Sequence, residues 1–262
     1  MKNNKTDTYF YSDELEDEFV KTSYRAKTID GAYKYAGKNV FFKLFSFICY
    51  RVVCTPIAFI YSKIIRNIKF VNKKALKQCK NQGYFIYANH TQPVSDAFTP
   101  SIITFPRQVY TVVSPQNLAI PFLGKLTKFL GALPLPETLE SNRNFLNTLE
   151  AKLKRKKAVL IYPEAHIWPY YTKIRPFKSV SFKYAVKFGA PVFSFTTTYQ
   201  KTQRNRLKTV VYVDGPFYAD GGLPPKLRQE ELRDRVFDAM CGRAKNSNYE
   251  KVKYIKTDKE KN

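Results

Sequence analysis

The pattern of apolar and polar positions after residue 80 predicts alternating strands and helices. Short runs of aromatic and β-branched residues bounded by turn residues are typical of buried strands. Five such runs occur, at 84–88 (YFIYA), 110–113, 158–162, 192–198 and 209–213. Apolar residues recur at helical spacing over 142–156, 179–188 and 227–241. This order predicts an α/β fold, in which helices flank a mixed sheet.

The most apolar part of the chain precedes these strands. From Leu44 to Ser62, nineteen residues carry one charge, Arg51. A straight helix of that length extends roughly 28 Å, close to the ~30 Å of a bilayer core. Arg51 near the middle and Pro56 oppose a simple span, and basic residues flank the segment. We predict a kinked helical anchor lying in the membrane interface, with a buried core helix and a true transmembrane span as alternatives.

These patterns divide the chain into four parts. We predict a mobile, locally acidic arm over 1–38, the helical membrane anchor over 39–70, an α/β domain over 71–244, and a loose, polar tail over 245–262. The first thirty residues hold seven Asp and Glu against five Lys and Arg. The start of the chain is polar and shows no secretory signal.

The formal net charge of +24 indicates an anionic partner, whether phospholipid headgroups, nucleic acid or an acidic carrier protein. Between Gly31 and Pro136 there are fourteen Lys and Arg and a single carboxylate, Asp96. The sequence has no zinc-finger spacing, no aromatic RNP-type strand and no basic-leucine heptads, which disfavours nucleic acid. The four cysteines form no CxxC pair and indicate reduced thiols in a cytosolic setting, with no metal site.

Both histidines follow predicted strands, and strand ends are where α/β folds bind ligands. His90 begins the segment HTQPVSD, and Asp96 lies six residues further on, at the start of a predicted helix. A carboxylate beside a histidine fixes the tautomer and stabilises the imidazolium, as a general base requires. The alternative is that Asp96 caps its helix and His90 is an ordinary buried histidine.

The segment NHTQPVSDAF resembles the first signature, NHxxxxD, of the glycerolipid (lysophospholipid) acyltransferase superfamily. GALPLPE (131–137), the segment 162–185 and APVFSFTTTY (190–199) resemble its second, third and fourth blocks, in the same order. The resemblance covers about residues 83–200. It implies an α/β domain with an N-terminal helical membrane-binding motif.

The resemblance also implies a reaction of the 1-acylglycerol-3-phosphate acyltransferase type, in phospholipid biosynthesis. His90 would deprotonate a hydroxyl of a lysophospholipid or similar glycerolipid, which attacks an acyl thioester, either acyl-CoA or acyl carrier protein. Asp96 would orient His90, and neither a metal nor a cofactor is implied. The expected location is the cytoplasmic face of an anionic cell membrane, as a peripheral or monotopic protein. The alternative is a catalytically silent basic protein that binds lipid or nucleic acid.

Several positions depart from the family pattern. Five residues separate His90 from Asp96 where the family has four, and Glu137 stands where the family has arginine. Glu164 matches the family glutamate and is expected to support the site and to contact the substrate. His166 is a candidate acceptor contact or a structural residue. Ile167 also stands where the family has arginine. Lys173 and Arg175 are candidate acceptor contacts in place of these two arginines. An aromatic group could line the site or simply pack: Trp168, Tyr170 and Tyr171.

Overall fold

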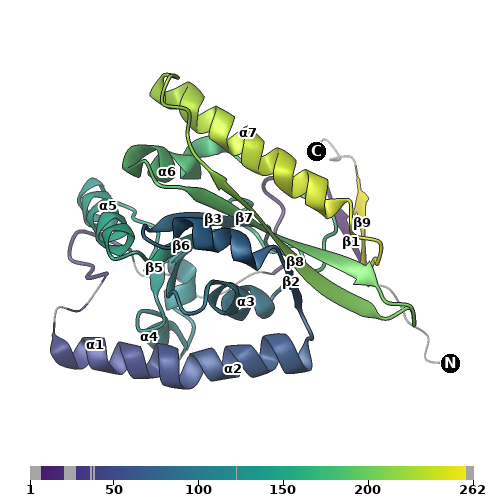
Figure 1. The fold of residues 1–262 in the computed structure, drawn as a ribbon, viewed down its shortest axis with the longest axis horizontal. Helices are drawn as coiled ribbons and strands as arrows, with labels where there is room; N and C mark the ends of the chain where they lie inside the picture. Colours follow the sequence, from purple (N-terminus) through teal and green to yellow (C-terminus); the bar gives the residue numbers. More distant parts are fainter. Residues whose placement is uncertain (1–6, 21–27, 36, 38, 122, 258–262) are drawn as a thin grey trace, which may run out of the picture.

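A seven-stranded sheet forms the centre of the computed structural model, which describes residues 7–20, 28–35, 37, 39–121 and 123–257 (Figure 1). The strands lie in the order β2 (Lys69–Val71), β8 (Leu207–Phe217), β7 (Val192–Lys201), β3 (Tyr84–Ala88), β6 (Ala158–Ile161), β4 (Val109–Val113) and β5 (Ala132–Pro134). All neighbouring pairs are parallel except β7 and β8, which are antiparallel. The predicted mixed sheet is therefore confirmed.

Strand β3 lies at the middle of the sheet and is buried along its whole length. Its side chains alternate between two apolar cores, with Phe85 and Tyr87 in one and Ile86 in the other. A strand that is covered on both faces needs a continuous apolar run, which explains the sequence YFIYA. The ends of this strand are consequently held in place from both sides of the sheet.

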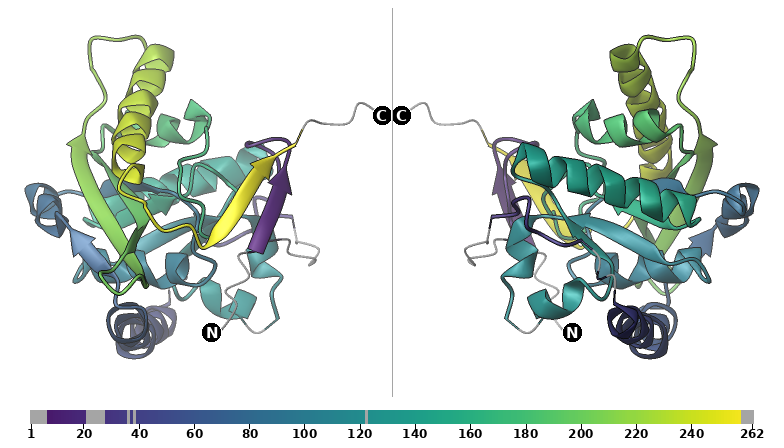
Figure 2. Two further views of the ribbon diagram at one scale, coloured as in Figure 1. Left: turned by 90° about the vertical axis from the view of Figure 1, so that its right-hand side faces the viewer. Right: turned by 90° about the vertical axis from the view of Figure 1, so that its left-hand side faces the viewer.

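Helices cover both faces of the sheet (Figures 1 and 2). One face carries α5 (Leu139–Lys154), α6 (Lys183–Phe188) and α7 (Pro225–Ala244), and the other carries α3 (Ser95–Thr104) and the 3-10 helix η3 (Lys73–Cys79). Three shorter elements complete the domain: η4 (Pro115–Leu118), α4 (Leu123–Thr127) and η5 (Ser179–Phe182). The predicted helices are confirmed, within a few residues at each end.

The apolar segment ahead of the sheet forms one continuous helical stretch along the lower side of the molecule in Figure 1. It comprises α1 (Val40–Phe47), η1 (Ile48–Cys54), α2 (Thr55–Phe59) and η2 (Ile60–Ile65), of which η1 and η2 have π-helical hydrogen bonding. The chain stays helical through Pro56. The wider turns on both sides accommodate the missing N–H, and the Thr55 hydroxyl donates to the Tyr50 carbonyl at 2.7 Å.

This helical stretch, residues 40–65, rests on the domain through polar contacts on one side. Ser46 Oγ donates to the Phe129 carbonyl at 2.7 Å, and the Val109 N–H donates to the Tyr50 hydroxyl at 3.1 Å. Elsewhere its apolar side chains are exposed, with Phe41 at 79% and Ile64 at 67%. This exposure contradicts the core-helix alternative. By length and composition the stretch could cross a membrane; whether it spans or lies in the interface stays a prediction.

The terminal segments pair with each other, contrary to the expected loose arm and tail. Strand β1 (Asp7–Tyr11) runs parallel to β9 (Val252–Lys256) and forms a second, two-stranded sheet (Figure 2). Tyr254 stacks on Trp168, with ring centroids 5.1 Å apart. Aromatic packing against Trp168 holds these polar segments in place. Because the contacts join distant positions in the sequence, local patterns do not reveal them. Residues 1–6 and 21–27 of the arm and 258–262 of the tail lie outside the described residues.

Candidate active site

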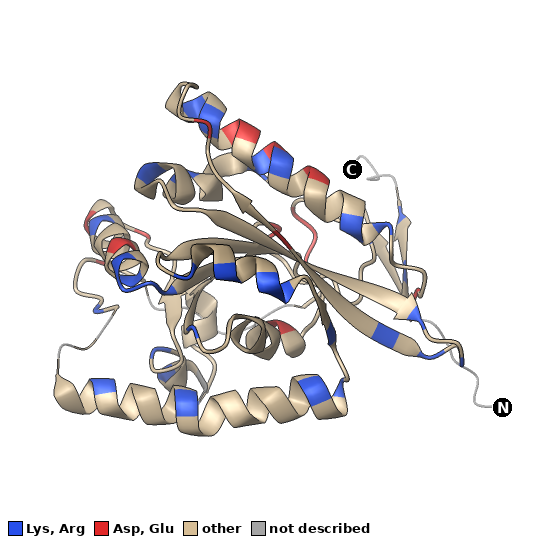
Figure 3. Cartoon of the chain, in the orientation of Figure 1, with Lys and Arg blue, Asp and Glu red and all other residues tan. Residues whose placement is uncertain are grey.

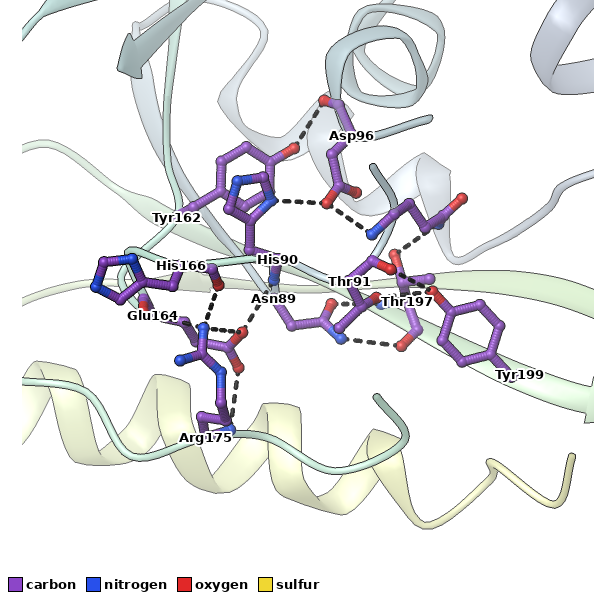
Figure 4. Close-up of polar contacts among 11 residues, drawn as sticks. Asn89, His90, Thr91, Asp96, Tyr162, Glu164, His166, Arg175, Thr197 and Tyr199 are labelled. Carbon is purple, nitrogen blue, oxygen red and sulfur yellow. Dashed lines mark hydrogen bonds and ion pairs between the residues drawn. The ribbon is translucent and has the colours of Figure 1, made fainter. Parts of the chain in front are cut away.

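The chain leaves strand β3 at Asn89, between the neighbouring strands β6 and β7 (Figure 4). The Asn89 side-chain amide donates to the Thr197 carbonyl at 3.1 Å, and the Thr197 N–H donates back to Asn89 Oδ1 at 2.8 Å. Both residues are buried. This reciprocal pair anchors the backbone immediately before His90, so the histidine projects from a fixed point at the strand end.

His90 and Asp96 form the pair expected from the sequence. His90 Nδ1 lies 2.8 Å from Asp96 Oδ2, and the side chains are 18% and 9% exposed. The same carboxylate oxygen accepts the Gln92 N–H at 3.0 Å. Helix α3 begins at Ser95 with Val94 as its N-cap, so Asp96 does not cap it through its side chain. The predicted pairing is confirmed, and the helix-cap alternative is wrong.

The loop between His90 and Asp96 absorbs the extra residue of this sequence. Gln92 and Asp96 exchange two bonds: the Gln92 N–H donates to the Asp96 carboxylate, and the Asp96 N–H donates to the Gln92 carbonyl at 3.2 Å. Pro93 and Val94 form the turn, and the Ser95 side chain is buried. Asp96, and not Ser95, supplies the side chain that contacts His90 Nδ1.

The pairing fixes which ring nitrogen can act. With Asp96 ionised, Nδ1 of a neutral His90 carries the proton that is shared with the carboxylate. The lone pair then resides on Nε2, on the opposite side of the ring. Because the ring is partly exposed, Nε2 is the atom that can accept a proton from a bound ligand.

Tyr162 supports both members of the pair, and sequence reasoning missed this role. Its ring stacks on the His90 imidazole with centroids 4.1 Å apart and an interplanar angle of 19°, and its hydroxyl donates to the Asp96 carbonyl at 2.8 Å. Burial, together with the nearby Asp96 carboxylate, raises the pKa of Tyr162 far above its ordinary value. The phenol therefore stays neutral. Its position directly after β6, beside the end of β3, was the signal available.

Glu164 holds the backbone of the site. Its carboxylate accepts the His90 N–H at 3.0 Å through Oε2 and the Arg175 N–H at 3.0 Å through Oε1. Burial raises the pKa of Glu164, while the Arg175 charge and the two N–H donors act in the opposite direction. The side chain is fully buried. Glu164 supports the site as expected, but the expected substrate contact is wrong because the carboxylate faces only protein.

Arg175 is not an acceptor contact in this structure. Its side chain is fully buried, and the guanidinium donates to the carbonyls of Glu164 at 3.1 Å, of Glu14 at 3.0 Å and of His166. It also lies over the Trp168 ring, 4.8 Å from the centroid. The expectation for Arg175 is wrong because a planar group with five donors is here used to bind loop carbonyls.

The remaining predicted residues lie apart from the pair. The His166 ring points away from His90 (Figure 4), and its Nδ1 is 3.7 Å from Glu18 Oε1. Lys173 is exposed on the same loop. Any contact of His166 or Lys173 with a substrate stays a prediction. Glu137, which replaces a family arginine, accepts the Ile29 N–H at 2.6 Å and so anchors the N-terminal segment.

Metal ligation was not expected from the sequence. Within the described part of the chain, no group of three or more His, Cys, Asp and Glu side chains is arranged to hold a metal ion. The expectation of a reaction without a metal or cofactor stays a prediction. The chemistry that this arrangement offers is that of one oriented imidazole and a carboxylate.

Comparisons with known proteins agree with this architecture. Residues 67–198, about half of the chain, match the family described as Acyltransferase. The fold is similar to the crystal structure of the 1-acyl-sn-glycerophosphate (LPA) acyltransferase PlsC from Thermotoga maritima, with a TM-score of 0.50 and 18% identity. That likeness covers 76% of this chain and 78% of the other. A comparison with curated protein sequences found no match.

Proposed function

The chain belongs to the acyltransferase family, and on that premise we propose that it transfers a fatty acyl group from an acyl thioester to a hydroxyl of a lysophospholipid or similar glycerolipid. The observation that carries this proposal is the 2.8 Å contact between His90 Nδ1 and Asp96 Oδ2 at the end of β3. The donor is acyl-CoA or acyl carrier protein. The 1-acylglycerol-3-phosphate acyltransferase type is supported by the fold likeness and by the four sequence blocks.

In this mechanism His90 Nε2 removes the proton from the acceptor hydroxyl as its oxygen attacks the thioester carbonyl. The new carbon–oxygen bond gives a tetrahedral oxyanion, and Asp96 stabilises the imidazolium that has formed. The oxyanion collapses, the carbon–sulfur bond breaks, and the imidazolium returns its proton to the departing thiolate. The products are an ester and a free thiol. A positioned base of this kind contributes about 10²–10⁴ in rate.

The surrounding residues serve this mechanism by restricting His90. Asp96 sets the tautomer, the Tyr162 ring limits rotation of the imidazole, and Glu164 fixes the backbone N–H. Preorganisation of this kind places the base within reach of the acceptor before the reaction begins.

We place the protein at the cytoplasmic face of an anionic membrane, held peripherally or monotopically by residues 40–65. Figure 3 shows Lys and Arg, without Asp or Glu, along this helical stretch. Its exposed apolar side chains suit the hydrocarbon boundary, and its cations suit the headgroups. A lipid acceptor would then enter the site without leaving the membrane.

The direct test is to incubate the pure protein with a labelled acyl thioester and a panel of lysolipids, and to identify products by mass spectrometry. The proposal predicts a labelled diacyl product with at least one acceptor and release of one free thiol per ester formed. Binding of lipid without any ester, across acyl-CoA and acyl carrier protein donors, would instead indicate a catalytically silent lipid-binding protein.

A further inference from the structure

Three side chains from distant parts of the sequence meet beside the catalytic loop. Arg66 follows the helical stretch 40–65, Tyr170 lies in the loop after β6, and Lys251 immediately precedes β9. Arg66 Nη2 donates to the Tyr170 hydroxyl at 3.3 Å, and Lys251 Nζ lies 3.7 Å from the centroid of the Tyr170 ring. We call these three residues the Tyr170 cluster. The resemblance to the family's sequence blocks gives this group of three residues no role.

The positive charges of this cluster are not neutralised within the protein. Among the described residues, neither Arg66 nor Lys251 forms an ion pair with a carboxylate. Burial raises the pKa of Tyr170, but Lys251 and Arg66 outweigh burial and leave this pKa below its ordinary value. Arg66 contacts the Tyr170 hydroxyl and Lys251 contacts the Tyr170 ring, so two like charges lie on one side chain. Because they repel each other, an anion placed between them would be stabilised.

The backbone at Tyr170 is held in an unfavourable conformation that keeps its ring in the cluster. Tyr170 has a φ of 59°, in the left-handed region that bulky residues rarely adopt. Its N–H donates to the Thr91 carbonyl at 2.8 Å, one residue after His90. Strained backbone of this kind concentrates at ligand-binding positions.

Tyr199 connects the cluster to the catalytic pair. Its ring packs on Tyr170 with centroids 5.3 Å apart, and its hydroxyl is 2.8 Å from Thr91 Oγ1 (Figure 4 shows Tyr199 and Thr91). Burial raises the pKa of Tyr199 far above its ordinary value; the Asp96 carboxylate acts in the same direction, and the hydrogen bond with Thr91 and the Arg66 charge act in the opposite one. The cluster therefore lies next to the candidate active site, on the side where the helical stretch 40–65 ends.

We propose that Arg66, Tyr170 and Lys251 bind a phosphate group. A phosphate offers several oxygens, which can accept from a guanidinium, an ammonium and a phenol at the same time. Two sources share this chemistry: the phosphate of a lipid acceptor bound at His90, and the headgroups of the bilayer beneath residues 40–65. The first source rests on the proposed acyl transfer. For that source, the Tyr170 cluster would supply the contacts to the phosphate that the buried Arg175 does not supply.

The test measures binding rather than turnover, on the full chain. The probes are a short-chain lysophosphatidic acid below its micelle concentration and the monoacylglycerol of equal chain length, each titrated by calorimetry. The variants are R66Q/K251Q and Y170F. The control is K187Q/R204Q, which removes two exposed positive charges on α6 and in the β7–β8 turn. Thermal unfolding verifies that each variant is folded.

We expect the wild type to bind the phosphate probe about 10- to 100-fold more tightly than the monoacylglycerol, as hydrogen bonds to charged groups generally give. R66Q/K251Q should lose this preference, Y170F should reduce it, and K187Q/R204Q should keep it. Inorganic phosphate should compete with the probe. Equal binding of the two probes by the wild type, or a preference unchanged in R66Q/K251Q, would exclude the acceptor as the source of the phosphate. If binding to phosphatidic acid vesicles is unchanged in R66Q/K251Q as well, the proposal is overturned.

A second arm identifies the source of the phosphate. Sedimentation is measured with vesicles of phosphatidylcholine alone and with added phosphatidic acid. If R66Q/K251Q loses its preference for the dispersed lysophosphatidic acid, the cluster binds the phosphate of the acceptor. If R66Q/K251Q loses only its binding to vesicles that contain phosphatidic acid, the cluster binds headgroups of the bilayer. Both results support a phosphate site. Because neither readout requires catalysis, absence of acyl transfer would remove the proposed function and leave the phosphate site standing.

Discussion

At the scale of single residues, the proposed mechanism depends on the charge of the Asp96 carboxylate beside His90. Replacing Asp96 with Asn keeps the volume and removes the charge that holds the Nδ1–H tautomer and stabilises the imidazolium. We expect D96N to reduce acyl transfer by about 10²–10⁴, with little change in the Michaelis constants. The measurement is kcat with a lysolipid acceptor, and D238N, at an exposed carboxylate of α7, is the control. Wild-type kcat in D96N would exclude the orienting role.

A second prediction at this scale concerns the buried pair of Arg175 and Glu164. Removing one partner of a buried ion pair costs about 3–5 kcal/mol, because the other charge remains uncompensated. R175M removes a group that lowers the pKa of Glu164, so this pKa should rise further above its ordinary value. A raised folded-state pKa of a carboxyl group contributes stability at low pH that is lost as the pH rises through that pKa.

The loss of stability in R175M relative to wild type should therefore be smaller at acidic pH, where Glu164 is protonated, and larger above its raised pKa. Urea unfolding of wild type and R175M across this pH range measures the difference. When E164Q/R175M is compared with E164Q, both lack the titrating carboxyl group, and this pH dependence should disappear. If the loss of stability in R175M does not change with pH, Glu164 is not the group whose titration the variant perturbs.

Residue roles were predictable from sequence where they depend on local spacing. His90 and Asp96 lie on one short loop, so their pairing could be predicted. Arg175 and Lys173 could not be told apart, because Arg175 is buried by contacts with Glu14 and Trp168, and Glu14 lies far away in the sequence. Tyr162 was missed since its stacking on His90 depends on which strands are neighbours.

At the scale of elements, the helical stretch 40–65 is expected to control membrane attachment. Each Lys or Arg near an anionic surface contributes about 1 kcal/mol, which salt screens, whereas buried apolar side chains contribute a part that salt does not weaken. The triple variant F41N/I64N/I65N should lose the salt-resistant part of vesicle binding, at about 1.5–3 kcal/mol for each fully buried apolar side chain. Sedimentation with anionic vesicles against salt concentration measures both parts.

The control for this experiment is L139N, at a still more exposed apolar position at the start of α5. Point substitutions are preferable to deletion of the N-terminal region, because that region also supplies β1 and the buried Ile29. Resistance of the wild type to both high salt and alkaline carbonate would favour a transmembrane span. Unchanged salt-resistant binding in the triple variant would contradict the role of this helix.

Elements with strong local patterns were predictable, and the others were not. Helix α5 follows a capping box between Thr138 and Ser141 and buries Phe145 and Leu149, so its periodicity was visible in the sequence. Strands β2 and β5 have three residues each, too few for a periodic signal. The pairing of β1 with β9 joins opposite ends of the chain and depends on aromatic contacts with Trp168.

At the scale of the whole molecule, the structure joins an exposed, apolar and basic helical stretch to the end of strand β3, which carries one oriented histidine. The net charge of +24 suits an anionic membrane and an acidic carrier protein as donor alike. The two terminal segments meet over the loop that contains Glu164 and His166, so residues near both ends of the chain support the site. In the proposed reaction this fold would bring the lipid surface, the acyl donor and the base together.

The most direct test of this account compares acyl transfer by the wild type, H90A and H166A. A folded protein is required, so unfolding of each is measured first. We expect H90A to lose about 10²–10⁴ in turnover while its unfolding midpoint stays near that of wild type, and we expect H166A to be affected much less. Wild-type turnover in H90A would contradict the assignment of His90 as the general base.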